Sequence, residues 1–405
     1  MKRQNQSSVV EFILLGFSNF PELQEQLFVV FLVVYLVTLM GNAIIIVVIS
    51  LEQSLHVPLY LFLQNLSVVD MGISAVIMPV MLVILSTEKM RIFTVGCFAQ
   101  MYFILLFGVT ECFLLGAMAY DWFTAICHPL SYPMIMNKIV FVKLVTFSWV
   151  SGITVATVQT TWVFSFPFCG SNEINHLFCE TPPVLELACA DTFLFEIYAF
   201  TGTILTVIVP FLLIFLSYVR ILFAILKMPS TTGRQKALST CASHLTSVTL
   251  FYGTASMTYL QPKSGYSPET KKLMSLAYTL LTPLLNPLIY SLQNSEMKRA
   301  LMKLWRRKVD IHTFWVCWET MWYLVLCDYT VLKFTYGENS LHSFLWMYQS
   351  VEFSKFENIW RKYISLDSVF TFILHRCITL MTYDITIYLS FPLLWTSMLL
   401  LDYCH

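Results

Sequence analysis

Seven long apolar segments constrain what this chain can fold into. A bilayer core of about 30 Å needs roughly 20 apolar residues of helix to cross it. Only 12% of the 405 residues are charged, about half the share found in a soluble domain. The sequence therefore predicts an all-α membrane protein, a bundle of seven transmembrane helices. The predicted spans are residues 27–49, 58–85, 98–120, 142–164, 197–224, 238–260 and 273–292.

Loop charges predict how the bundle is oriented. The inner end of the fifth span and the connection after it hold four Lys or Arg and no acid: Arg220, Lys227, Arg234 and Lys236. The stretch after the seventh span, expected to be a short basic amphipathic helix, is also basic. The connection before the fifth span is acidic. Basic loops remain in the cytosol, so we expect the N-terminus outside, where Asn5 of the Asn-Gln-Ser sequon is a glycosylation candidate. No cleavable signal peptide is visible.

Cysteine placement agrees with this orientation. Four cysteines fall at predicted outer positions, where an oxidising compartment permits disulfides, and their three possible pairings stay open on sequence alone: Cys97, Cys169, Cys179 and Cys189. Cys112, Cys127 and Cys241 fall within or below the membrane and are expected to stay reduced as small apolar side chains.

Other function classes find little support in the sequence. It has no nucleophile elbow, no phosphate-binding glycine loop and no HExxH motif, so we do not expect an enzyme. An inverted repeat typical of a transporter is also absent from the sequence. The 24 basic residues balance the 24 acidic ones, which gives no reason to expect a nucleic-acid partner.

Six motifs stand in register along residues 1–305. They are GN at 41–42, LHVPLYLFLQNLSVVD at 55–70, MAYDWFTAICHPLSYP at 118–133, SYVRI at 217–221, KALSTCASHL at 236–245 and PLLNPLIYSLQNSEMKRAL at 283–301. Together they closely resemble the olfactory receptor family of rhodopsin-like G-protein-coupled receptors. The long outer loop at 168–191, with three cysteines, is also similar to that family.

The resemblance implies two disulfides, Cys97–Cys179 and Cys169–Cys189. It further implies a multi-pass plasma-membrane protein of olfactory neuron cilia that binds small volatile odorants and couples to a stimulatory G protein that raises cAMP. His176, Cys179 and Glu180 lie close together like metal ligands. A disulfide at Cys179 removes its thiolate, so no metal is expected there.

A second set of residues suggests an activation switch. Asp70 lies deep in the second span, where a carboxylate is costly unless it is paired or hydrated, and Asn42 and Asn286 can donate hydrogen bonds to it. In the family this cluster holds sodium and water, so the resemblance implies a sodium ion near Asp70; a purely structural hydrogen-bond cluster is the alternative. Pro287 kinks the seventh span, and Tyr290 below it, with Tyr218 on the fifth span, completes the predicted switch.

Helical spacing in the outer halves of the spans suggests a ligand pocket. Residues at i, i+1, i+4 and i+5 share one face of a helix, although ordinary helix packing gives the same pattern. The predicted lining is apolar with a few hydroxyls and no charge, which suits a small, largely apolar volatile. It consists of Ile104, Leu105, Gly108, Val109, Gly202, Thr206, Tyr252, Ala255, Ser256, Tyr259 and Thr279.

The chain departs from the family pattern at the end of the third span. Asp121-Trp122-Phe123 stands where the family has Asp-Arg-Tyr, and Gln293 stands where an Arg is usual. Arg has five hydrogen-bond donors and a permanent positive charge, whereas Trp has one donor and no charge. We therefore expect Asp121 to lack its adjacent partner. A receptor-like protein with impaired or no signalling is the alternative to a working receptor.

The second departure is the C-terminal tail. Residues 1–307 form the expected receptor domain, and 308–405 are an atypical aromatic-rich extension that holds six of the ten tryptophans. Read-through of a lost stop codon is the simplest hypothesis for 308–405. A membrane-associated extension and an interaction domain are the alternatives.

Overall fold

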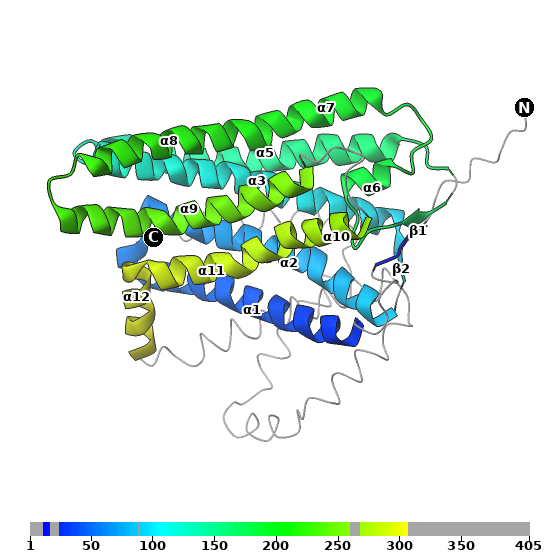
Figure 1. The fold of residues 1–405 in the computed structure, drawn as a ribbon, viewed down its shortest axis with the longest axis horizontal. Helices are drawn as coiled ribbons and strands as arrows, with labels where there is room; N and C mark the ends of the chain where they lie inside the picture. Colours follow the sequence, from blue (N-terminus) through cyan, green and yellow to red (C-terminus); the bar gives the residue numbers. More distant parts are fainter. Residues whose placement is uncertain (1–10, 17–23, 88, 170, 260–267, 307–405) are drawn as a thin grey trace, which may run out of the picture. The chain divides into compact units, whose positions relative to one another are not determined.

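The computed structural model describes residues 11–16, 24–87, 89–169, 171–259 and 268–306. The predictions that concern Asn5 and residues 308–405 lie outside this part of the chain. Within it, long helices run side by side as a bundle (Figure 1).

Seven helical spans form the bundle and confirm the predicted fold class. The first four are α1 (Gln24–Leu51), α2 (Pro58–Thr87), α3 (Thr94–Cys127) and α5 (Lys138–Ser165). The fifth joins α7 (Phe193–Thr203) to α8 (Val209–Leu226) through the π-helix η3 (Ile204–Ile208). The sixth is α9 (Thr231–Tyr259). The seventh joins α10 (Pro268–Leu276) to α11 (Thr282–Gln293) through the π-helix η4 (Ala277–Leu281).

Short elements connect and cap these spans. A 3₁₀ turn, η2 (Gln53–Leu55), follows α1; α4 (Tyr132–Ile135) follows α3; α6 (Thr181–Leu185) lies in the long outer loop. The Asn137 side chain accepts the Val140 N–H and so starts α5 at Lys138. The expected amphipathic helix after the seventh span is α12 (Ser295–Arg306), where Lys303 pairs with Glu52 at 2.8 Å.

Six of the spans in the described residues are apolar enough to cross a membrane by composition alone, and α9 is the exception. Its many Ser and Thr residues lower its hydropathy, but several of them bond internally: Thr246 and Thr254 donate to carbonyls four residues earlier. This is how polar side chains are satisfied in a membrane-spanning helix.

Helix α3 lies at the centre of the bundle. It contacts α2, α5, α8 and α9, whereas α11 contacts α1, α2 and α9 and so closes the bundle. The outer helices expose apolar faces, for example Phe147 on α5 at 58% and Phe223 on α8 at 61%. Water would disfavour such surfaces by about 25 cal/mol per Å², so lipid must cover them. The chain is a multi-pass membrane protein.

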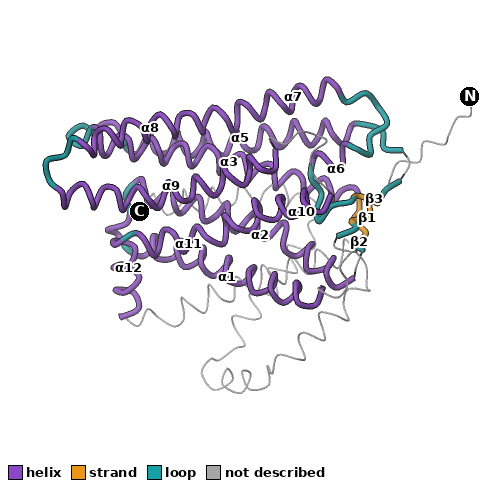
Figure 2. The backbone as a smooth tube through the Cα atoms, viewed as in Figure 1, coloured by secondary structure: helices purple, strands orange, loops and turns teal. Residues whose placement is uncertain are grey.

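A small sheet at one end of the bundle was not predicted from the sequence (Figure 2). Strand β1 (Glu11–Leu14) pairs antiparallel with β2 (Met90–Phe93), with Glu11 opposite Phe93, and parallel with β3 (Glu173–Ile174). The sheet joins residues 11–14 to the α2–α3 connection and to the acidic loop. All three therefore lie at the same end, as the predicted outside N-terminus requires.

Gly152 makes the packing of α5 on α3 testable. A Cβ there would lie 2.6 Å from the Leu106 carbonyl oxygen and closer still to the Thr110 hydroxyl. Backbone cannot yield cheaply, so Gly152→Ala should destabilise the protein by about 1–3 kcal/mol and lower its melting temperature in detergent. The matched control is Gly253→Ala, because no atom lies within 4 Å of a Cβ there. An equal fall in both variants would contradict this account.

Candidate functional site

A chain of buried polar side chains links three helices in the middle of the bundle. The Asn286 amide on α11 donates to the Asp70 carboxylate on α2 at 3.0 Å. Ser247 on α9 donates to the Asn286 amide oxygen at 2.7 Å. All three residues are at most 1% exposed. The predicted contact of Asn286 with Asp70 is present, and Ser247 adds a link to α9 that the sequence reasoning did not include.

Asn42 has a different partner from the one expected. Its amide donates to the Pro283 carbonyl at 3.1 Å rather than to Asp70. Pro287 has no N–H, so the Pro283 carbonyl lacks its helical donor four residues ahead. Asn42 supplies the missing hydrogen bond across the α1–α11 contact. Gly41 allows this close approach, because a Cβ there would lie 2.9 Å from the Pro287 Cβ.

Glu111 is a second buried acid that the sequence reasoning missed. It lies on α3, is 1% exposed, and interacts electrostatically with Asp70. Among the described residues, Asp70 Oδ1 and Glu111 Oε1 have no hydrogen-bond partner. Two buried carboxyls, each with an unpartnered oxygen, fit a small cation. The sequence signal was an acid in the middle of the third predicted span.

Asp121 lies at the cytoplasmic end of α3 and has a partner from outside its own helix. The Tyr132 hydroxyl of α4 donates to its carboxylate at 2.8 Å, and Asp121 is 2% exposed. From the sequence we expected only that the adjacent residue, Trp122, would supply no partner, and Tyr132 comes from the turn after α3. Burial and the Asp121 carboxyl both raise the pKa of Tyr132, so its hydroxyl remains a donor.

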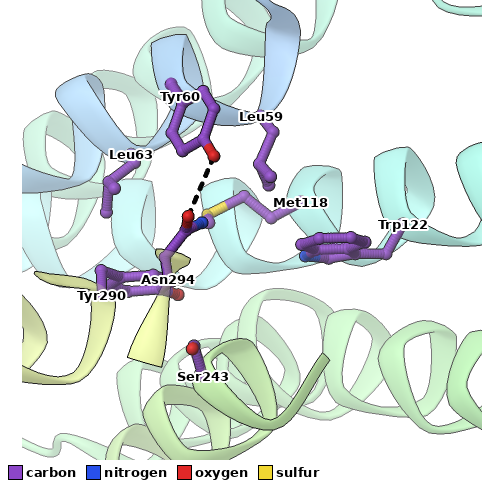
Figure 3. A pocket seen from close by; sticks show the side chains of 8 residues that line it. All are labelled: Leu59, Tyr60, Leu63, Met118, Trp122, Ser243, Tyr290 and Asn294. Atoms are coloured by element: carbon purple, nitrogen blue, oxygen red, sulfur yellow. Dashed lines mark hydrogen bonds between the residues drawn. The ribbon is translucent and has the colours of Figure 1, made fainter. Parts of the chain in front are cut away.

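The other predicted switch residues also lie toward this end of the bundle. Tyr218 on α8 and His244 on α9 are hydrogen-bonded at 2.8 Å with their rings stacked. Trp122 is partly buried and packs against a small apolar cluster formed by Ile221, Ile225 and Cys241. Trp122 also lines a small pocket together with Tyr290 (Figure 3).

The predicted ligand-lining residues are only partly brought together. Ile104, Tyr252 and Ala255 belong to the main apolar core of the bundle, but Leu105 packs against a separate cluster beneath the outer loop. Gly108 faces Tyr278, whose hydroxyl oxygen would lie 2.8 Å from a Cβ there. Val109 is buried at 8% exposure, Ser256 is partly buried, and the Tyr259 side chain lies outside the described part.

Two π-helices, η3 and η4, shape the fifth and seventh spans near the predicted lining residues. An i→i+5 turn inserts a residue and rotates every following side chain. In η4, Tyr278 joins the core beside Gly108, while the hydroxyl of the predicted Thr279 bonds to the Ser275 carbonyl at 2.8 Å. In η3, the Thr206 hydroxyl bonds to the Gly202 carbonyl at 2.8 Å. From the sequence we named only Thr279 as a lining residue on the seventh span and did not include Tyr278.

The outer loop is tied to the bundle by covalent and polar contacts. Disulfides join Cys97 to Cys179 and Cys169 to Cys189, with Cα separations of 5.4 and 5.8 Å. Cys179 therefore has no thiolate to offer a metal. Its backbone N–H donates to Gln100 on α3 at 2.8 Å.

His176 and Glu180 continue these contacts to α10 and to the N-terminal segment. Glu180 accepts from Ser275 at 3.3 Å and lies 3.7 Å from the His176 ring. Lys272 donates to the Gly16 carbonyl at 2.8 Å. Gly16 has φ of 55°, a left-handed conformation that suits glycine. The N-terminal segment is thereby fastened over α10.

Comparisons with known proteins give one family. The olfactory receptor family model matches residues 31–308, which include α2 to α12 in full and most of α1. Olfactory receptor 10A3 of Homo sapiens is 85% identical over 314 residues, covering 78% of this chain and 100% of that protein. Olfactory receptor 10A6 of Homo sapiens is 80% identical over 313 residues, covering 77% and 100%.

The Asn42 contact predicts a coupled pair of substitutions. Asn42→Leu leaves the Pro283 carbonyl without a donor and should cost about 1–3 kcal/mol of stability. Pro287→Ala restores the helical N–H for that carbonyl, so in this background the same substitution should cost clearly less. The melting temperatures in detergent of the native protein, the two single variants and the double variant measure this double-mutant cycle. Strictly additive losses would show that the two residues do not share the carbonyl.

His176 predicts a pH dependence of the outer loop. Burial lowers its pKa below the usual 6.5 and Lys272 adds to this, while Glu180, Glu186 and the Phe178 carbonyl act in the opposite direction. Below pH 6.5 the unfolded chain gains a proton that the folded loop resists, so stability falls as the pH drops. The melting temperature should fall more between pH 7.5 and 5.5 in the native protein than in His176→Gln. Parallel slopes would rule His176 out as the cause.

Proposed function

The chain belongs to the olfactory receptor family, and on that premise we propose that it binds small, mostly apolar odorants and activates a stimulatory G protein that raises cAMP. Its site of action would be the ciliary membrane of olfactory neurons. The observation that carries the proposal is the buried chain Asp70–Asn286–Ser247, which joins α2, α11 and α9 beside an aromatic core.

The odorant site of this proposal lies in the outer half of the bundle. The predicted lining residues carry hydroxyl groups but no charge, which suits an uncharged molecule with one hydrogen-bonding group. Tyr278 is added to that lining, because its ring contacts Phe251 and its hydroxyl faces Gly108. Burial of apolar ligand surface at about 25 cal/mol per Å² supplies most of the affinity.

A path of contacts leads inward from this site. Phe251 touches both Tyr252 and Tyr278, with ring centroids 5.1 and 6.1 Å apart. Phe251 and Ser247 lie one turn apart on α9, so a shift of the aromatic rings moves the residue that holds Asn286. A ligand changes the conformation only if it binds the two arrangements with different affinity, and these rings are where the difference would arise.

Asp70 and Glu111 are the residues that would hold the sodium ion of the polar cluster. The ion, when bound, supplies a positive charge that offsets the two buried carboxylates. Without it, one of these carboxyls is expected to carry a proton, because two neighbouring carboxylates repel each other at short range. In this structure Asp70 accepts a hydrogen bond from Asn286.

At the cytoplasmic end, the proposal assigns G-protein contact to the faces of α3, α8 and α9 around Trp122, Tyr218 and His244. The competing hypothesis is a receptor-like protein with impaired or no output. The specific observation in its favour is that the Asp121 carboxylate is bound by Tyr132, while Trp122 offers no charge for a partner.

A cAMP reporter assay with the full chain separates these hypotheses. The native protein, Trp122→Arg, Asn286→Leu and the control Gly253→Ala are expressed with surface delivery measured by antibody, and an odorant panel is applied. We expect responses from the native protein and the control, and a loss of at least tenfold in sensitivity for Asn286→Leu.

Two outcomes would contradict the proposal in different ways. A response from Trp122→Arg but not from the native protein would support the receptor-like alternative. Silence of all variants despite surface delivery would argue against odorant signalling through a stimulatory G protein altogether.

A further inference from the structure

A small pocket lies at the cytoplasmic end of the bundle, between four helical spans (Figure 3). Trp122 of α3 points its ring nitrogen toward the middle of the pocket, and Ser243 of α9 and Tyr290 of α11 approach from other sides (Figure 3). The walls are mostly apolar. The lining residues are Leu59, Tyr60, Leu63, Met118, Trp122, Ser243, Tyr290 and Asn294.

Three polar groups of this pocket have no protein partner. Among the described residues, Trp122 Nε1, Ser243 Oγ and Tyr290 Oη are buried without a hydrogen bond. Ser243 and Tyr290 are only 3% and 5% exposed. Ser247 lies near the Tyr290 hydroxyl without forming a hydrogen bond to it, and its own proton is donated to Asn286. Buried polar groups are almost always hydrogen-bonded, so three around one pocket require a common partner.

The remaining polar groups of the pocket are already used. The Tyr60 hydroxyl donates to Asn294 Oδ1 and lies 3.1 Å from the Glu296 carboxylate. Asn294 Oδ1 also accepts from the backbone N–H groups of Glu296 and Met297. The space between the three unpartnered groups suits a water-sized occupant rather than an odorant. A buried water typically makes two to four hydrogen bonds, which matches the three groups.

We propose that one water molecule binds in this pocket, accepts the Trp122 indole N–H, and hydrogen-bonds to the Ser243 and Tyr290 hydroxyls. This water bridge holds the cytoplasmic ends of α3, α9 and α11 together in the resting receptor. Water-mediated contacts are nearly as favourable as direct ones. A single neutral donor on Trp122 thus takes part in a resting-state contact between three helices.

The regulatory meaning of the bridge rests on the proposed function, because α9 must separate from α3 when a G protein binds. The bridge itself is measurable without odorant or G protein. A negative cAMP assay would therefore not affect the test of the water bridge, and a negative test of the water bridge would not affect the cAMP assay.

Hydrogen exchange on the purified full chain tests the coupling. Trp122→Phe keeps a ring but removes the N–H, and Ser243→Ala removes the hydroxyl. Each should speed amide exchange in residues 241–248 of α9 about fivefold, the effect of losing one ordinary hydrogen bond. Since both groups share one water, the double variant should exchange little faster than either single variant.

Trp149→Phe is the matched control. It also removes an indole N–H, but one that donates to Asn65 at 3.2 Å in the α2–α5 contact, so exchange in residues 241–248 should not change. Unchanged exchange in Trp122→Phe, or fully additive effects in the double variant, would overturn the proposal.

A second measurement uses the native sequence and so does not depend on the variants folding. The protein is labelled with ¹⁵N at the tryptophan indoles, and the Trp122 resonance is assigned by its loss in Trp122→Phe or, should that variant misfold, in Trp122→Tyr. The Trp122 N–H should show a magnetisation-transfer peak to a long-lived water, and the Trp149 N–H should not. Absence of the Trp122 peak would also overturn the proposal.

Discussion

The hydrocarbon core of a membrane offers no hydrogen-bond partners, and the rest of the structure depends on this constraint. A polar group inside the bundle must find its partner in the protein or in a bound water or ion, because lipid offers none. Pro287 shows the consequence most directly: its missing N–H leaves the Pro283 carbonyl free, and Asn42 from another helix satisfies it. The proline-containing turn of the seventh span is thereby tied to α1. The same requirement joins Asp70, Asn286 and Ser247 by hydrogen bonds. A movement of α2, α9 or α11 therefore disturbs the polar contacts of the other two helices.

The two ends of the bundle are held by different kinds of contact. At the outer end, disulfides, a three-stranded sheet and the Lys272–Gly16 contact cross-link loops far apart in sequence. At the cytoplasmic end the described contacts are noncovalent: hydrogen bonds such as Tyr132 to Asp121 and Tyr218 to His244, an ion pair and a small apolar cluster. Local opening requires least free energy where such contacts are few and separable. A rigid outer end and a separable inner end suit a protein that converts outside binding into inside movement.

The number and order of the helices could be predicted from the sequence, because the length of each apolar segment can be judged without knowing what it packs against. The family motifs likewise located Asp70, Asn286 and Tyr218. The Asn42 partner was not readable, since it depends on a backbone carbonyl that a proline four residues later leaves free. Tyr278 was not named because only Thr279 was considered as a lining residue on the seventh span, and Tyr132 was not named because the partner of Asp121 was sought only beside it. Glu111 was readable, as an acid within an apolar span, but was overlooked.

Trp122 brings these themes together. An arginine at this position would carry a charge into a partly buried site and would need the neighbouring carboxylate to offset it. With Trp122 there, Asp121 binds Tyr132 instead, and α4 takes over part of what a neighbouring cation would do. The indole meanwhile packs on Ile221, Ile225 and Cys241, so its resting position is stabilised by apolar contact between α3, α8 and α9. If the chain signals as proposed, this neutral side chain would bias the balance between resting and active states through packing rather than charge. A ligand would have to bind the two states with a larger difference in affinity to reverse that bias.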